Sequence, residues 1–277
     1  MGLAVRPLPA SGSPSKQLGR FPASLPVKAS SHRVLTGLAG VLAFIGLWKA
    51  SHHFAWTGAG TMPDPFLLPE AFWDEWASGR LLPAIGSSLI HYAWGLGLGA
   101  TLGMAVGFAA ATNSVFEAAH AILARVLRPI PPLAWVVFAI AWFQVSHAGA
   151  ALVIAIGVFW VNYFATYAAI RGGDPRYREL ARAFGQTGWW RLSLTITLPE
   201  AAPGILSGFR TGIGQAWMAL IAAELLGVPG MGQEMNSAAG VGAYEAVVIY
   251  MFAISLMYAF CDYAFVRFEN WVLQWRP

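Results

Sequence analysis

The chain has 277 residues, of which 57% are hydrophobic and only 11% charged, against a charged share of about 25% in soluble domains. This balance excludes a soluble globular core and indicates one integral membrane domain. The single Cys261 excludes an internal disulfide. The formal net charge of +4 does not indicate a nucleic-acid partner, because the basic residues first have to be placed on a membrane topology.

Residues 1–33 hold five basic residues and no acidic residue, and they are rich in Ser and Pro. They predict a disordered, basic cytoplasmic tail, and residues 34–277 are predicted to form the membrane domain. A cleaved signal peptide is the alternative reading. It needs an apolar run near the start of the chain, whereas the first long apolar run begins at Val34.

The apolar segments predict an all-α integral membrane protein with about six transmembrane helices. In chain order they lie at 34–48 (extending toward Trp56), within 81–116, from Leu133 to about Ser146, and at 150–170, 201–226 and 246–266. The third segment is shorter than the roughly 20 residues that cross a bilayer. It must therefore recruit residues before or within the proline break at 129–132.

Two stretches between the spans are polar or rich in glycine. Residues 70–76 predict a short interfacial helix with its aromatic side chains toward lipid or protein. A metal site at Asp74 and Glu75 is the alternative, but no His or Cys supports it. Residues 227–243 predict turns.

A glycine ladder runs through the second span: Gly95, Gly99, Gly103 and Gly107 recur at every fourth residue, with Gly97 beside them. Transmembrane helices associate largely by close backbone packing, which such a ladder permits. A helix that slides during transport and a static packing surface are both consistent with it.

The loop at 171–200 is a long, charge-rich interruption between apolar segments. Asp174 suits a helix N-cap, Pro175 the first helical position, and Gly185 the residue just past the end. One apolar face follows helical spacing and comprises Tyr177, Leu180, Ala181 and Phe184. A second short helix is predicted at 189–197, closed by Pro199. A lipid-surface helix, a docking helix and an ordinary helical loop are all consistent with this periodicity.

The run from Glu179 to Ala181, the following Gly185, and Ile196-Thr-Leu198-Pro199 resemble the cytoplasmic "EAA" loop of ABC importer permeases. The resemblance implies a type I ABC importer permease fold in which this loop carries the coupling helix that docks into a groove on the ATPase subunit. Leu180 replaces the usual alanine, and Leu198-Pro199 comes one residue later than in the family pattern. The implied coupling residues are Tyr177, Glu179, Leu180, Ala181, Phe184, Gly185, Leu198 and Pro199.

Residues 127–134 and the Trp142-Phe143 pair resemble the sulfonate, taurine and nitrate branch of these permeases. The branch implies a small anionic solute, two cytoplasmic ABC ATPase subunits, a second permease copy as a homodimer, and an extracytoplasmic substrate-binding protein. This chain has no G-x-x-x-x-G-K-[ST] phosphate loop. We therefore expect a non-catalytic subunit without a cofactor of its own, and ATP bound by the partner ATPases.

The basic residues predict the orientation in the bilayer. With six spans and both termini inside, all but three of the 17 Lys and Arg residues lie on the inner side. Lys49 and Arg80 fall outside, and Arg210 lies within a span. This bias follows the positive-inside rule and places the 171–200 loop in the cytoplasm. The resemblance implies a multi-pass protein of the bacterial inner membrane.

Polar groups within spans are costly and are functional candidates by default. We predict four residues as candidates for the substrate pathway: His91, Gln215, Trp217 and Glu224. Each also has a structural reading: packing for His91, Gln215 and Trp217, and hydration for Glu224. Arg210 and Asp262 are expected to pair or to reach the inner surface.

Three other functions are alternatives to an importer subunit. A secondary transporter driven by an ion gradient needs paired ionisable residues at the midplane and an internal repeat, and the sequence shows no convincing repeat. A membrane enzyme needs cofactor ligands or a nucleophile and base, and neither spacing is present. A structural subunit of a membrane complex is the third.

Overall fold

The computed structural model describes residues 31–56, 60–225 and 227–275, which form helices joined by turns and loops, with no strand among them. The predicted tail at 1–33 lies outside these residues, except that its last three residues already begin helix α1. The chain divides into two compact units, residues 1–50 and 51–277, and each is described by itself.

The first unit contains most of α1, Ser31–His53. Its 23 residues exceed the roughly 20 that cross a bilayer, and they coincide with the first predicted span. Large apolar side chains such as Leu35, Leu42 and Phe44 are more than half exposed. Such a surface suits contact with lipid.

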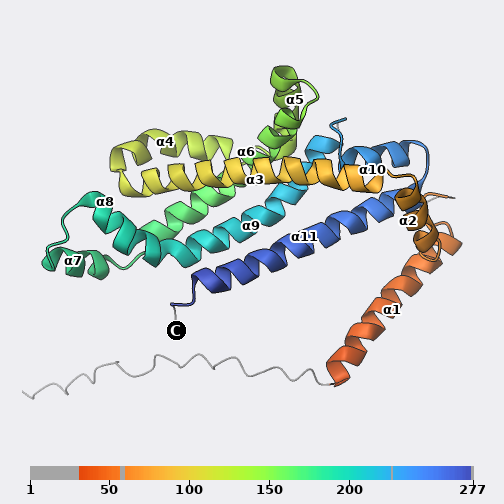
Figure 1. Cartoon of the computed structure of the whole chain (residues 1–277), viewed down its shortest axis with the longest axis horizontal. Helices are drawn as coiled ribbons and strands as arrows, with labels where there is room; N and C mark the ends of the chain where they lie inside the picture. Colours follow the sequence, from red (N-terminus) through yellow and green to blue (C-terminus); the bar gives the residue numbers. More distant parts are fainter. Residues whose placement is uncertain (1–30, 57–59, 226, 276–277) are drawn as a thin grey trace, which may run out of the picture. The chain divides into compact units, whose positions relative to one another are not determined.

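The second unit is a bundle of long helices with shorter helices between them (Figure 1). In chain order they are α2 Leu68–Ala77, α3 Leu81–Thr112, α4 Ser114–Leu127, α5 Pro132–Phe143, α6 His147–Arg171, α7 Pro175–Ala183, α8 Trp189–Leu192, α9 Leu198–Glu224, α10 Met231–Gly240 and α11 Tyr244–Val272.

Three helices of the described chain, α3, α6 and α11, are by length and composition apolar enough to cross a membrane, and α4 with α5 would make a fourth if the bent pair is one span. With α1 and the 27-residue α9, a helix stands at every predicted span. The short helix α2 also lies where the sequence placed it.

The third predicted span is broken rather than continuous. The residues before the prolines form a separate helix, α4, and α4 and α5 meet at 98°. Proline lacks an N–H and clashes with the preceding turn, so Pro129, Pro131 and Pro132 prevent one helix from running through. The 12 residues of α5 are therefore not extended by α4 into a straight span.

Two further local predictions are wrong. Pro199 does not close the helix before it, because a π-helical turn at Ser193–Thr197 carries the chain from α8 directly into α9. The hydrogen-bond pattern shifts in this wider turn, so the helix continues although Pro199 has no backbone N–H to donate. The glycine-rich stretch at 227–243 is also not all turn, since Met231–Gly240 forms α10.

The core of the second unit lies where α3, α6 and α9 pack. Helix α3 meets α6 through the glycine ladder. A methyl group at Gly99 would lie 2.5 Å from the carbonyl oxygen of Ala155, and one at Gly103 would lie 2.5 Å from that of Phe159. The ladder is thus a surface of direct backbone contact, as its spacing predicted.

Helix α2 is tied to the long helices by a buried carboxylate. Glu75 is 5% exposed and accepts hydrogen bonds from Arg80 at 2.7 Å and from the hydroxyl of Tyr250 at 2.8 Å. The bond to Glu75 raises the pKa of the Arg80 guanidinium. Glu75 therefore serves an ion pair, and no group that could hold a metal occurs among the described residues.

Candidate functional site

The charge-rich loop forms a helix with well-defined ends. The Asp174 side chain accepts a hydrogen bond from the backbone N–H of Arg176 at 2.9 Å, and Pro175 starts α7. At the other end Gly185 has φ +80°. Gly185 N–H donates to Arg182 O, and Gln186 N–H donates to Ala181 O, which is the Schellman pattern. All three predicted boundary roles are confirmed.

Helix α7 presents an apolar surface without a partner within the described chain. Tyr177, Leu180 and Phe184 are 56%, 57% and 79% exposed. Ala181, expected on the same face, is buried. Glu179 is exposed. Because α7 is otherwise polar and charged, these three exposed apolar side chains leave one face of the segment available for contact with a partner or with lipid.

The last two predicted coupling residues lie elsewhere. Leu198 and Pro199 form the first turn of α9, and Leu198 lines a separate apolar cavity beside Trp189 and Trp190. They are not part of the exposed face of α7.

A carboxylate that the sequence analysis did not single out links α7 to α9. Oε1 of Glu200, in the first turn of α9, accepts a hydrogen bond from the backbone N–H of Asp174 at 2.5 Å. A methyl group on Gly173 would lie 2.8 Å from Oε2 of Glu200, so the chain passes close to this carboxylate. The segment just before α7 is therefore held directly against the first turn of α9.

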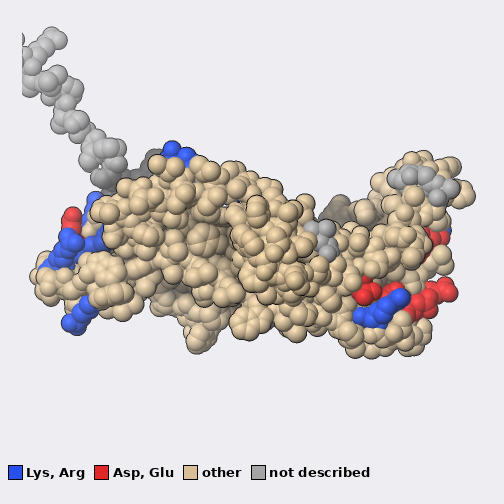
Figure 2. Space-filling view, turned by 90° about the horizontal axis from the view of Figure 1, so that it is seen from above, with Lys and Arg blue, Asp and Glu red and all other residues tan. Residues whose placement is uncertain are grey.

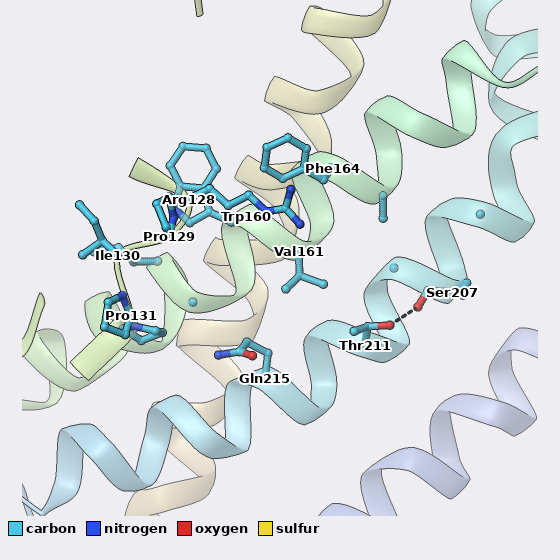
Figure 3. Close-up of a pocket in the computed structure, with 16 residues that line it drawn as sticks. Arg128, Pro129, Ile130, Pro131, Trp160, Val161, Phe164, Ser207, Thr211 and Gln215 are labelled. Atoms are coloured by element: carbon cyan, nitrogen blue, oxygen red, sulfur yellow. Dashed lines mark hydrogen bonds between the residues drawn. The ribbon is translucent and has the colours of Figure 1, made fainter. Parts of the chain in front are cut away.

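Farther along α9 a cavity of about 520 Å³ opens between three elements: the proline link, α6 and α9. Figure 3 shows Arg128 reaching from the link along α6, while Ser207, Thr211 and Gln215 project from α9. These three residues share a helix face, since they follow one another at four-residue steps. The lining contains no Asp or Glu.

Only one of the four predicted pathway residues lines this cavity. Gln215 does. Trp217 is 4% exposed and stacks on Tyr92 with ring centroids 4.6 Å apart, so it belongs to the core. His91 and Glu224 are fully buried in another cluster.

That cluster joins four helices around Glu224. The carboxylate accepts hydrogen bonds from Ser88 Oγ at 2.9 Å and from the backbone N–H of Gly232 at 2.8 Å. It also lies 2.9 Å from Nδ1 of His91, whose Nε2 is 2.5 Å from Nδ1 of His147. The alternative reading of Glu224 as a hydrated side chain is wrong, because this side chain is 0% exposed.

The arginine within a span is neutralised. Arg210 makes two hydrogen bonds to Asp262, Nε to Oδ1 at 2.8 Å and Nη2 to Oδ2 at 2.9 Å. The predicted pairing is confirmed. Arg128, in contrast, makes no ion pair with any residue that the structure describes, and its guanidinium lies 4.3 Å from the ring centroid of Phe164.

A protein-family comparison covers most of the second unit. Residues 81–275 match the family of the binding-protein-dependent transport system inner membrane component. The chain belongs to this family. The predicted identity as an ABC importer permease is thereby confirmed, and the protein is a transport component.

Relatives of this permease agree with the match. The putative aliphatic sulfonates transport permease protein SsuC of Bacillus subtilis is 30% identical over 87% of this chain and 88% of its own. The bicarbonate transport system permease protein CmpB of Synechococcus elongatus is 29% identical over 87% and 89%.

The fold of this permease also has a solved counterpart. A structure of the inward-facing MetNI methionine ABC transporter aligns with a TM-score of 0.63 over 72% of this chain and 98% of that one. At 16% identity the likeness shows the fold alone. The predicted all-α, type I importer permease fold is confirmed.

Proposed function

We propose that this permease works as a homodimer in an ATP-driven importer of a small anion, with two ATPase subunits docked on α7 and a substrate-binding protein on the outer side. ATP binds to the partner subunits, and the permease converts their closure into a motion of its helices. The observation that carries the proposal is the exposed apolar face of α7, held by caps at both ends and bonded to α9. The relatives named for sulfonate and bicarbonate transport support an anionic solute.

The distribution of charge supports the orientation. Figure 2 shows basic side chains gathered toward the end of the second unit that carries α7. Helix α2, toward the other end, carries Glu70, Asp74 and Glu75 and no basic residue. Under the positive-inside rule we infer that α7 faces the cytoplasm of a bacterial inner membrane, where an ATPase can reach it. Both chain termini are inferred to lie on that side.

The docking role is tested by placing a charge on the exposed face of α7. We expect the wild-type permease to co-purify with an ATPase subunit from its native membrane, and Leu180→Glu or Phe184→Glu to reduce the recovered ATPase at least tenfold. An unpaired glutamate in an apolar interface costs a few kcal/mol. Arg182→Glu is the matched control, because Arg182 lies on the opposite side of the same helix.

Two outcomes would contradict the docking role. One is a wild-type permease that carries no ATPase, and the other is an equal loss of ATPase in Arg182→Glu. Uptake that survives ATP depletion but collapses with the ion gradient would favour the secondary transporter. Ala181→Trp does not test docking, because Ala181 is buried and a larger side chain there displaces α7 itself.

The link between α7 and α9 gives a second prediction. Glu200→Ala removes the acceptor of the Asp174 N–H, so α7 should still bind the ATPase but move α9 less. We expect unchanged ATPase co-purification, with solute uptake per ATP hydrolysed reduced about tenfold in proteoliposomes. Glu200→Gln, which keeps an acceptor oxygen, should retain most of the coupling. Equal coupling in Glu200→Ala and wild type would show that this bond transmits nothing.

A further inference from the structure

The cavity beside α9 contains a cation, Arg128, that makes no ion pair with any residue the structure describes. Arg128 follows the last residue of α4, at the break before α5. Its neighbour Glu117, with which it shares a second cavity, is already bonded to Arg171 at 3.0 Å and to Tyr167. Among the residues that the structure describes, no carboxylate therefore occupies the guanidinium N–H groups of Arg128, which lies over the Phe164 ring.

The opposite wall supplies further hydrogen-bond groups. The amide of Gln215 makes no hydrogen bond with any residue that the structure describes, although the side chain is half-buried. Thr211 donates its hydroxyl to the carbonyl oxygen of Ser207 at 3.0 Å. The Ser207 hydroxyl has no such bond within the described chain. The cavity thus has donors on both sides and no carboxylate.

Such an arrangement favours a particular ligand chemistry. A guanidinium binds planar or tetrahedral oxyanions through paired N–H donors. Arg128 and Ser207 are exposed, so a small anion can reach both side chains from the open cavity. The volume of about 520 Å³ accepts a small solute with some water.

We propose that Arg128, Gln215 and Ser207 form the anion-recognition site of the transport route, with Arg128 as the residue that determines the sign of the transported charge. This inference rests on the proposed function. The ligand is a small monovalent oxyanion such as nitrate, bicarbonate or a sulfonate. The phosphate of an anionic lipid has the same chemistry and is the competing occupant.

The experiment measures the electrostatic potential in the cavity. In a Cys261→Ser background, Gln215→Cys is labelled with two methanethiosulfonate reagents, one carrying a sulfonate and the other a trimethylammonium group. The permease is assembled with its ATPase in phosphatidylcholine vesicles. We expect Arg128→Ala to lower the ratio of anionic to cationic labelling rates about tenfold, the order expected for one charge across a partly hydrated cavity. Arg128→Lys should largely restore it.

Arg125→Ala is the matched control, because Arg125 lies one turn earlier in α4 and does not line this cavity. In the labelled protein that keeps Arg128, millimolar nitrate or methanesulfonate should lower the labelling rate of the anionic reagent. This protection should vanish in Arg128→Ala. An unchanged rate ratio, or an equal fall in Arg125→Ala, would overturn the proposal. So would protection by added phosphatidylglycerol without protection by either small anion, since the occupant would then be lipid.

The readout separates this inference from the proposed function. Arg128→Ala should leave ATPase co-purification intact, because α7 is not altered. Loss of the ATPase from the wild type would refute the importer assembly, yet the labelling ratio would still report on the cavity. An intact assembly with no Arg128 effect on labelling would refute only the anion site.

Discussion

Gly103→Ala is expected to lower the thermal stability of the permease in detergent, whereas Gly97→Ala is not. The added methyl group at 103 would lie 2.5 Å from the carbonyl oxygen of Phe159. A backbone oxygen cannot relieve the clash by changing rotamer, as a side chain can. The helices α3 and α6 must therefore move apart. Overpacking of this kind costs about 1–3 kcal/mol, and Gly99→Ala should add a similar loss, because its methyl group would meet the Ala155 carbonyl.

Gly97 provides a control of the opposite sign. Its methyl group would meet nothing within 4 Å, so Gly97→Ala gains helix propensity of up to about 1 kcal/mol without a clash. The measurement is the melting midpoint of the purified protein, followed by tryptophan fluorescence. If Gly97→Ala and Gly103→Ala move the midpoint equally, the ladder is not a packing surface and the α3–α6 contact is incorrect.

Features that depend on neighbouring residues in the chain were predictable from the sequence. The caps of α7 follow from Asp174, Pro175 and Gly185 alone, because capping bonds span only a few residues. Long apolar runs identify spans, since the bilayer fixes their length. The every-fourth-residue glycines identify the packing face of α3 for the same reason: helix geometry is local.

Features that depend on distant contacts were not predictable in the same way. Glu224 looked hydrated near the end of a span, yet Ser88 and Gly232, 136 and 8 residues away, bury it. Trp217 looked like a pathway residue because of its position in the span, but Tyr92 covers it. Periodicity could have indicated the polar face of α9 that lines the cavity, since Ser207 and Thr211 precede Gln215 at intervals of four residues.

The proline errors have a common physical cause. A proline removes one hydrogen bond, but its consequence depends on what the surrounding backbone can do. Three prolines at 129, 131 and 132 interrupt the series of helical hydrogen bonds, so α4 and α5 are two helices with a bend of 98° between them. A single Pro199 is absorbed by a π-helical turn. The sequence thus shows where a helical hydrogen bond is lost, but not whether the helix ends there or continues through a wider turn.

Glu224→Ala is expected to produce the largest loss of stability in the described chain. It would leave the hydroxyl of Ser88, the N–H of Gly232 and the His91 ring without their buried acceptor. Removing one member of a buried polar pair costs about 3–5 kcal/mol, and in a unit of this size each kcal/mol lowers the melting midpoint by about 2–4 °C. A fall on the order of 10 °C should follow, and Glu224→Gln, which keeps the shape and one acceptor, should lose less.

A double-mutant cycle assigns this loss to the cluster rather than to a general effect of losing a carboxylate. A methyl group on Gly230 would fall on the Glu224 carboxylate, so Gly230→Ala alone should destabilise the protein. In the Glu224→Ala background the space is free, and the same change should cost little, which gives a coupling energy of about 1 kcal/mol or more. Glu70→Ala, at an exposed carboxylate, should leave the midpoint unchanged. Strict additivity of Gly230→Ala and Glu224→Ala would show that α10 does not rest on Glu224, since two residues in contact cannot be energetically independent.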